Sequence, residues 1–326
     1  MSYSKTTLAK ADRILEKRRA KAERIHLARH MEITNKIPQI SELETMLSQT
    51  GLEVVKAIGM GKDAKEYIEN LSVHNLAVQE NIKELLNKNG YSVDYLQTPY
   101  TCPICNDTGF SGIYYCECRK ELLKEIALNE LSAVSTSEKC SFDNFKLDYY
   151  PLPVDPQLGI SPQKRMNEVF NYCKCYAEDF DLDSESLYMH GATGLGKTHL
   201  SLAIANEVTK NGYHVIYDTA QNIFSTLERE KFGHGNSYDK EKDILECDLL
   251  IIDDLGSEFT TQFTTAALYN IINTRINRSK PVIISTNLTD EELEEKYTQR
   301  VTSRIIGNYV SIFFLGKDIR QLKKNF

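Results

Sequence analysis

A glycine-rich octapeptide carries the clearest chemistry in this chain. Residues 191–198 read GATGLGKT and satisfy the pattern G-x4-G-K-[ST]. Glycines at these positions let backbone N–H groups curl around a phosphate, and the N-terminus of the following helix adds partial positive charge. Lys197 is expected to reach the β- and γ-phosphates, and the Thr198 hydroxyl to ligate Mg²⁺. We therefore predict that ATP binds to a loop made of Gly191, Ala192, Thr193, Gly194, Leu195, Gly196, Lys197 and Thr198.

Two carboxylates follow a buried-strand pattern further along the chain. The apolar run Leu249–Ile252 delivers Asp253 and Asp254 to the carboxyl end of a predicted strand. Ligands of open α/β sheets bind at that edge. Asp253 is placed to hold Mg²⁺, directly or through water. Asp254 is placed to orient or deprotonate an attacking water as a general base.

Further polar residues are candidates for contact with the γ-phosphate. Asn287 ends the predicted strand VIISTN and can serve this purpose only if its strand lies between the other two. A turn-forming Asn at a helix start is the alternative. Arg300, Arg304 and Arg320 lie towards the C-terminus. Arginines that stabilise a transferring phosphoryl group often come from a neighbouring subunit, but surface arginines are equally common.

Four of the eight cysteines form a cluster in sequence. CPIC at 102–105 is followed by CEC at 116–118, so Cys102, Cys105, Cys116 and Cys118 can close around one ion. Four thiolates joined by a glycine-containing hairpin are typical of a structural Zn²⁺ site, which organises structure and leaves no open position for catalysis. A redox pair or an iron–sulfur cluster is the alternative. We expect Cys140, Cys173, Cys175 and Cys247 to be packing residues.

The pattern of elements indicates how these residues are positioned. Residues 6–90 have helical periodicity, whereas the second half alternates apolar strands with helices, which predicts a parallel sheet covered on both faces. Five strands are expected, within 187–190, 214–218, 248–253, 281–287 and 309–315. We expect four regions: a helical part at 1–97, a cysteine module with its following helix at 98–134, a linker at 135–162, and the nucleotide-binding domain at 163–326.

Composition and charge restrict the class of protein. The 326 residues carry a net charge of −7, and no stretch approaches 18 consecutive apolar residues. The N-terminus has no apolar signal region, so we expect a cytoplasmic protein without membrane attachment. The first helix is basic despite the overall acidity, with Lys5, Lys10, Arg13, Lys17, Arg18, Arg19, Lys21, Arg24, Arg29 and Lys36. Such an arm can bind phosphate, dock on an acidic protein face, or remain a solvated surface.

Taken in order, these motifs resemble those of AAA+ ATPases, and more narrowly the bacterial replicative helicase loaders of the DnaC/DnaI type. The resemblance runs from about Cys102 to the end and rests on GATGLGKT, LLIIDDLG (249–256), ISTNL (284–288) and RVTSRI…GKDIR. It implies that Asn287 is the sensor-1 residue, Arg304 an arginine finger acting across a subunit boundary, and Arg320 the sensor-2 residue. Phe142 and Phe145 would lie near the adenine, or serve as core residues.

The resemblance also implies a fold and a function. We expect an AAA+ P-loop domain with a parallel five-stranded sheet, preceded by an α-helical region with a small zinc module. The family's insertion that contacts single-stranded DNA would fall within 220–238, where Arg229, Lys231, Phe232 and Tyr238 offer charge and stacking. The expected function is an ATPase that self-associates through this domain, binds a DnaB-type helicase and loads it onto single-stranded DNA.

Three other functions remain open from the sequence. A transposition helper ATPase has very similar core motifs and would bind double-stranded DNA. A nucleotide-switched adaptor would bind its partners with incidental hydrolysis. A small-molecule P-loop kinase would need an acceptor site, of which the sequence shows no sign.

Overall fold

The computed structural model describes residues 3–58, 64–134, 140–156, 159–233 and 240–322. It divides into two compact units, one formed by Asp12–Arg119 and the other by Met1–Ala11 together with Lys120–Phe326. These units divide the chain differently from the four regions expected above. We describe each unit by itself.

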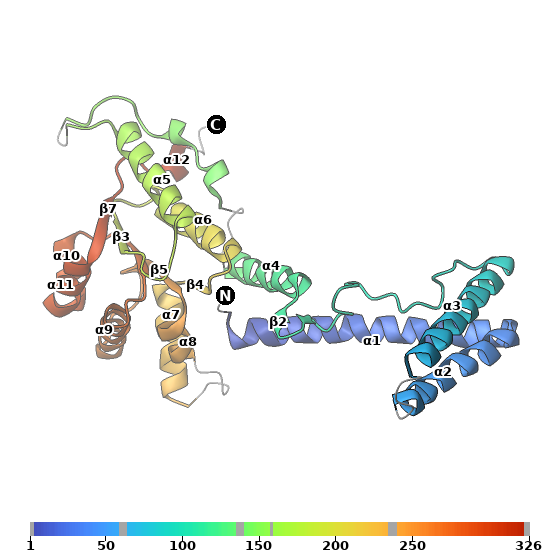
Figure 1. The fold of residues 1–326 in the computed structure, drawn as a ribbon. Helices are drawn as coiled ribbons and strands as arrows, with labels where there is room; N and C mark the ends of the chain where they lie inside the picture. The colour runs from blue at the N-terminus through green and yellow to red at the C-terminus, as the bar shows by residue number, and fades with distance from the viewer. Residues whose placement is uncertain (1–2, 59–63, 135–139, 157–158, 234–239, 323–326) are drawn as a thin grey trace. The chain divides into compact units, whose positions relative to one another are not determined.

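The unit at Asp12–Arg119 is mainly helical (Figure 1). Its helices and strands are α1 (Lys5–Lys36, which begins in the other unit), α2 (Pro38–Ile58), α3 (Ala64–Lys88), β1 (Phe110–Ser111) and β2 (Tyr114–Tyr115). Ile33, Ile37, Ile40 and Leu86 form a buried cluster where α1, α2 and α3 meet. Beside it, hydrogen bonds from Lys36, Tyr95 and Tyr91 lower the pKa of Glu32 to about 2. The predicted helical character of this region is confirmed.

The second unit contains a five-stranded parallel sheet in the order β4-β5-β6-β3-β7. The strands are β3 (Ser186–His190), β4 (Val215–Thr219), β5 (Leu249–Leu255), β6 (Val282–Thr286) and β7 (Tyr309–Phe313). The helices are α4 (Glu117–Val134, which begins in the first unit), α5 (Pro162–Glu178), α6 (Lys197–Lys210), α7 (Ala220–Lys231), α8 (Lys240–Glu246), α9 (Gln262–Asn277), α10 (Asp290–Tyr297), α11 (Gln299–Asn308) and α12 (Ile319–Leu322).

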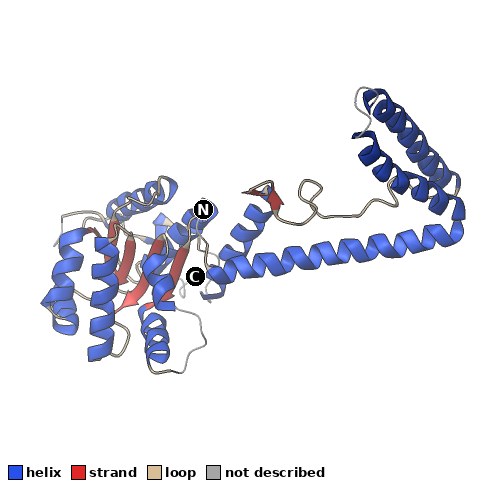
Figure 2. Ribbon diagram, turned by 60° about the horizontal axis from the view of Figure 1, so that its bottom comes forward, coloured by secondary structure: helices blue, strands red, loops and turns tan. Residues whose placement is uncertain are grey.

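Helices cover both faces of this sheet, as the strand composition predicted (Figure 2). Successive residues of a strand point to opposite faces, so the two apolar layers divide each strand between them. On β5, Leu249 and Ile251 pack against α5 and α6, whereas Leu250 and Ile252 pack against the α7, α9 and α11 side. The buried core therefore fixes the register that brings the strand ends together.

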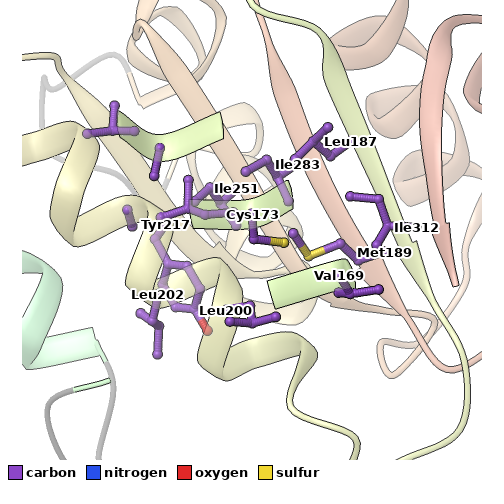
Figure 3. Packing of buried hydrophobic residues seen from close by; sticks show 14 of the residues in the cluster. Val169, Cys173, Leu187, Met189, Leu200, Leu202, Tyr217, Ile251, Ile283 and Ile312 are labelled. Atoms are coloured by element: carbon purple, nitrogen blue, oxygen red, sulfur yellow. The ribbon is translucent and has the colours of Figure 1, made fainter. Parts of the chain in front are cut away.

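The four isolated cysteines do not share one environment. Cys173 is fully buried among Val169, Met189 and Ile251 (Figure 3). Cys247 is also buried, and Cys140 is half-buried against the same core. Cys175 is exposed, so the expectation that it packs in the core is wrong. Two residues further along α5 than Cys173, it points away from the sheet, because i and i+2 lie on different helix faces.

The segment expected as an extended linker contains two short 3-10 turns. η2 (Phe142–Asn144) and η3 (Leu147–Tyr149) lie directly before α5. Tyr150, which follows η3, is buried, and its hydroxyl donates a 2.8 Å hydrogen bond to the carbonyl of Leu195 in the glycine loop. This part of 135–162 is therefore packed onto the nucleotide-binding domain rather than only connecting to it.

Candidate functional site

The glycine loop lies between the end of β3 and the start of α6, as predicted. Gly191, Gly194 and Gly196 have φ values of +133°, +74° and +91°, a region that favours glycine. A Cβ on Gly191 would lie 2.5 Å from the Phe314 carbonyl oxygen, and one on Gly196 would lie 2.9 Å from the Phe145 ring. Both positions thus need glycine for space as well as for backbone conformation.

Lys197 is buried at the first position of α6. Its Nζ donates hydrogen bonds to the carbonyl oxygens of Gly191 (2.6 Å) and Ala192 (2.8 Å) and to Asn287 Oδ1 (2.7 Å). Burial lowers the pKa of Lys197 to about 8, against the opposing effect of Asp254 and Asp253. An anion close to Nζ would favour the charged form of this lysine.

Asp253 is almost fully buried and accepts three hydroxyl hydrogen bonds. Thr198 Oγ1 and the Tyr217 hydroxyl donate to Oδ2 at 2.9 and 2.8 Å, and Ser285 Oγ donates to Oδ1 at 2.5 Å. Thr198 and Asp253, which the sequence predicts to share Mg²⁺, are therefore in direct contact. Tyr217 and Ser285 were missed, because only the sheet register brings them beside Asp253.

Asp254, the residue after Asp253, adopts an unusual backbone conformation. Its φ is +55°, and the pairing of β5 with β6 is irregular between Ile252 and Leu255. Such a bulge re-aims a side chain at a strand end. The Asp254 N–H donates to Ser285 Oγ (2.9 Å), and Asn287 Nδ2 donates to Asp254 Oδ1 (2.9 Å). Lys197, Asn287 and Asp254 are thereby connected by hydrogen bonds across three elements.

The condition set for Asn287 is met by the strand order. β6, which Asn287 follows, lies between β5 and β3. Asn287 therefore lies between the glycine loop and the two aspartates and contacts both sides. The helix after it starts at Asp290 with Thr289 as the cap, whose hydroxyl accepts from the Glu292 N–H. Thus Thr289, not Asn287, caps this helix.

These side chains open into one cavity of about 980 Å³. Its lining residues are Cys140, Asn144, Phe145, Lys146, Tyr149, Tyr150, Thr193–His199, Tyr217, Thr219, Asp253, Asp254, Ser285, Asn287, Ile319 and Arg320. Phe145 is held by stacking on Tyr150 and Phe170, with ring centroids 5.9 and 5.5 Å apart. Phe142 packs edge-on against Phe170 instead of lining the cavity. One end of the cavity is therefore polar and the other aromatic.

The donor set fits a magnesium nucleotide. A glycine loop at a helix N-terminus with a buried lysine suits phosphate, and a carboxylate beside a threonine hydroxyl suits Mg²⁺. Asp253 and Thr198 would hold the ion, Lys197 would hold phosphate, and the Phe145 end would hold the base. This assignment follows from the chemistry of the donors.

The candidate arginines lie in different places. Arg320 on α12 lines the cavity and contributes to the lowered pKa of Lys197. Its segment contacts the glycine loop, since the Ile319 N–H donates to the Gly194 carbonyl at 3.0 Å. Arg300 and Arg304 lie on α11 as predicted, and neither lines the cavity. Within one chain the cavity has Arg320, and Arg304 is not brought to it.

The four clustered cysteines converge, as their spacing predicted. Their Sγ atoms all lie within 4.8 Å of one another, with Cys102–Cys116 at 3.8 Å and Cys105–Cys118 at 3.5 Å. Four thiolates at the usual Zn–S distance lie about 3.8 Å apart in a tetrahedron. The Gly109 N–H points at Cys105 Sγ (3.3 Å), as expected for a stabilised thiolate. The donor set thus fits a structural Zn²⁺ ion.

Two residues near the cysteines were not singled out from the sequence. Asp107 is buried with φ +57° and accepts hydrogen bonds from the Thr101 and Cys102 N–H groups. The Arg119 guanidinium lies over the rings of both Phe110 and Tyr115, 4.7 and 4.6 Å from their centroids, and pairs with Asp12 at 2.7 Å. These contacts hold the hairpin and the first cysteine pair in place.

The segment expected to contact DNA is partly described. α7 covers 220–231, and Tyr238 lies outside the described residues. Phe232 is 63% exposed, and Lys231 lies over the ring of Phe263 from α9 at 5.0 Å. The Arg229 guanidinium donates to the Ser225 carbonyl of its own helix. The exposed Phe232 and the nearby cation Lys231 are thus present, and both contact the ring of Phe263.

The glycine loop, the parallel sheet and the cavity define a P-loop nucleotide-binding domain. Residues 174–306 match a family model described as IstB-like ATP binding protein. The replicative helicase loader DnaC of Escherichia coli K12 is 27% identical over 179 residues, which are 54% of this chain and 67% of that protein. The DnaC of Buchnera aphidicola from Acyrthosiphon pisum is 26% identical over 188 residues, covering 57% and 71%.

A crystal structure of the DnaC helicase loader aligns with a TM-score of 0.45 and 21% identity, over 54% of this chain and 97% of that one. Over about half of its length this chain is therefore similar to proteins named replicative helicase loader DnaC. Among the described residues, no helix is both long enough and apolar enough to span a membrane.

Proposed function

We propose that this protein is an AAA+ ATPase that binds a replicative helicase of the DnaB type and loads it onto single-stranded DNA. The observation that carries the proposal is the hydrogen-bonded series Lys197–Asn287–Asp254 at the mouth of one cavity. It supports hydrolysis rather than binding alone, because a polar sensor contacts both the phosphate-binding lysine and the candidate base. The similarity to proteins named replicative helicase loaders supports the cellular role.

Each residue has a stated part in the proposed reaction. Bound Mg²⁺-ATP supplies the scissile phosphoanhydride bond. Lys197 neutralises phosphate charge, and Thr198 with Asp253 binds the metal. Asp254 accepts a proton from the attacking water at a carboxylate oxygen, and Asn287 orients that water. Arg320 adds positive charge from within the same chain.

Arg304 has its proposed part only in an assembly. It lies on α11 outside the cavity lining, so we propose that it completes the site of an adjacent copy. Self-association through the ATPase domain follows from this role. We further propose a structural Zn²⁺ at Cys102, Cys105, Cys116 and Cys118, a helicase-binding role for the helical N-terminal region, and a cytoplasmic location.

The test uses the full-length protein with the DnaB-type helicase of the same cell and a single-stranded DNA circle. We expect co-purification with the helicase and ATP-dependent transfer of it to the circle. Asp254→Asn should retain ATP binding and lose at least about a hundredfold in hydrolysis, because the base is removed. Asn also tolerates the positive φ of this position.

The outcomes separate the remaining functions. Failure of the wild-type protein to bind the helicase would refute the loader role. Loading that survives Asp254→Asn would identify a nucleotide-switched adaptor instead. The match to an IstB-like family model favours a transposition helper as the second candidate. That function requires tighter binding to double-stranded than to single-stranded DNA and association with a transposase.

A further inference from the structure

Helix α1 carries a row of basic side chains on one face. Arg13, Lys17, Lys21 and Arg24 are spaced by four, four and three residues, and all four are exposed. At about 100° per residue they fall within an arc of about 80°. Leu15 and Ala22 are buried on the opposite face. We call Arg13, Lys17, Lys21 and Arg24 the basic stripe.

Acidic residues are kept off the basic stripe. Asp12, Glu16 and Glu23 lie together along one flank of the helix, where Asp12 pairs with Arg119 and Glu23 approaches Arg19 at 3.7 Å. Throughout the part of the chain that the structure describes, no carboxylate lies within 4.0 Å of a stripe nitrogen.

The charge arrangement of the stripe lowers the stability of α1, whereas α3 pairs its lysines with glutamates. On α3, Lys65, Lys83 and Lys88 each lie within 4.0 Å of a glutamate three or four residues away. On the stripe, three pairs at this spacing carry like charges, Arg13–Lys17, Lys17–Lys21 and Lys21–Arg24, and each such pair destabilises a helix by about 0.2–0.5 kcal/mol. Glu16, three residues after Arg13, is the one acidic residue at this spacing from a stripe residue. A merely solvated face does not require this segregation, whereas a site for a polyanion does.

We propose that the basic stripe binds the sugar-phosphate backbone of DNA. Regularly spaced Lys and Arg side chains neutralise a row of phosphates without reading sequence. Among the four cations, the exposed residue on this face is the small Ala20. The larger exposed apolar residues Leu27 and Met31 follow Arg24 in the sequence. A protein interface needs an apolar centre, which the stripe lacks. The inference goes beyond the proposed function, because the stripe lies outside the ATPase domain.

The test measures the salt dependence of DNA binding by the full-length protein. The variant Arg13→Gln/Lys17→Gln/Lys21→Gln/Arg24→Gln keeps helix propensity, since Gln ranks beside Lys and Arg. For a single-stranded oligonucleotide, loss of four phosphate contacts should reduce the slope of log K against log salt by about 3. For a duplex of the same length the reduction should be about 3.6. The form of DNA, single-stranded or duplex, whose affinity falls more in the stripe variant is the form that the stripe prefers.

A control variant removes the same charge elsewhere. Lys83→Gln/Lys88→Gln/Lys174→Gln/Lys210→Gln replaces four exposed lysines that each lie near a glutamate. It should leave the slope within about 1 of the wild-type value. An unchanged slope in the stripe variant, or an equal fall in the control, overturns the proposal. An unchanged slope together with lost helicase binding would assign the stripe to an acidic protein face. Helicase loading is not needed for either DNA result, so the two proposals fail independently.

Discussion

The carboxylate of Asp253 shows how much a single predicted residue depends on neighbours that the sequence does not reveal. The motif predicted its position at a strand end, and the structure agrees. Its contacts with Tyr217 and Ser285 arise from β4 and β6, which pair with β5 on either side. No local pattern marks those two residues, because their nearness to Asp253 depends on strand order and register.

Ser285 should position the metal-binding carboxylate. In Ser285→Ala, Asp253 loses the hydrogen bond to Oδ1, and partners of metal ligands typically contribute 10–100-fold in metal affinity. We expect the Mg²⁺ concentration for half-maximal ATPase activity to rise about tenfold.

The adjacent residue provides a matched control for that experiment. Thr286 Oγ1 donates to the Leu255 carbonyl and has no contact with Asp253. Thr286→Val should therefore leave the Mg²⁺ requirement unchanged even if it lowers stability. Equal Mg²⁺ requirements in both variants would show that Ser285 does not act through the metal.

Lys197 should make nucleotide binding depend on pH. Its pKa is lowered to about 8 by burial, and a bound phosphate raises that pKa because the anion favours the charged form. Binding is then strongest below pH 8, where Lys197 is already charged. Above pH 8 it requires uptake of a proton, so affinity falls by up to about tenfold per pH unit.

Calorimetry in buffers of different ionisation enthalpy measures this proton uptake directly. At pH 8 we expect roughly half a proton per ATP bound, since the lysine is about half charged there. Lys197→Arg keeps a charge at all these pH values and should abolish the uptake. Proton uptake that persists in Lys197→Arg would point to another group.

At the scale of elements, the cysteine hairpin depends on one buried arginine. Arg119 packs over the rings of Phe110 and Tyr115, and its charge is paired with Asp12 of α1. Cation–π contacts of this kind are worth about 0.5–2 kcal/mol each when desolvated. The hairpin strands are only two residues long, so these contacts and the thiolate cluster must hold the module together.

Removal of that charge should weaken metal retention. In Arg119→Met, which keeps the apolar volume, we expect the urea concentration that releases zinc to fall, for a loss of about 1–3 kcal/mol. Arg24→Met, which changes an exposed arginine of α1, should release zinc at the wild-type concentration. If the wild-type protein purifies without zinc, or both variants behave alike, the role of Arg119 is wrong.

Features that depend on a short stretch of sequence were predictable, whereas features that depend on packing between distant residues were not. The cysteine pairs and the glycine loop are short motifs, so their geometry follows from spacing. The bulge at Asp254 and the turns at η2 and η3 depend on distant contacts, such as those of Ser285 and Leu195. The residues expected as a linker accordingly form one wall of the nucleotide cavity.

At the scale of the whole molecule, the chain combines a domain that matches a family model with a helical region outside that match. The family model matches residues 174–306, which contain four of the five strands and most of the cavity lining. The helical region carries the cysteine module and the basic stripe, although the protein as a whole has a net charge of −7. The basic stripe thus lies outside the matched residues in sequence.

The roles proposed for Arg304 and for the helical region also belong to this scale. Arg304 needs an adjacent copy of the chain, and the helical region needs the helicase. Sequence alone could not place them for the same reason, since both need a second molecule. Arg304 remains a prediction that an assembled form must test. The helicase contact of the helical region is likewise a prediction that the complex must test.

The positive φ of Asp254 restricts which amino acids can occupy this position at all. Gly, Asn and Asp adopt that conformation with little strain, whereas longer or branched side chains do so at a cost of about 1–3 kcal/mol. Of the three, only Asp can accept a proton. A glutamate, although chemically the nearest relative, would meet the chemical requirement and fail the conformational one. For the proposed base at this position, the backbone conformation therefore restricts the residue type as strongly as the need for a carboxylate does.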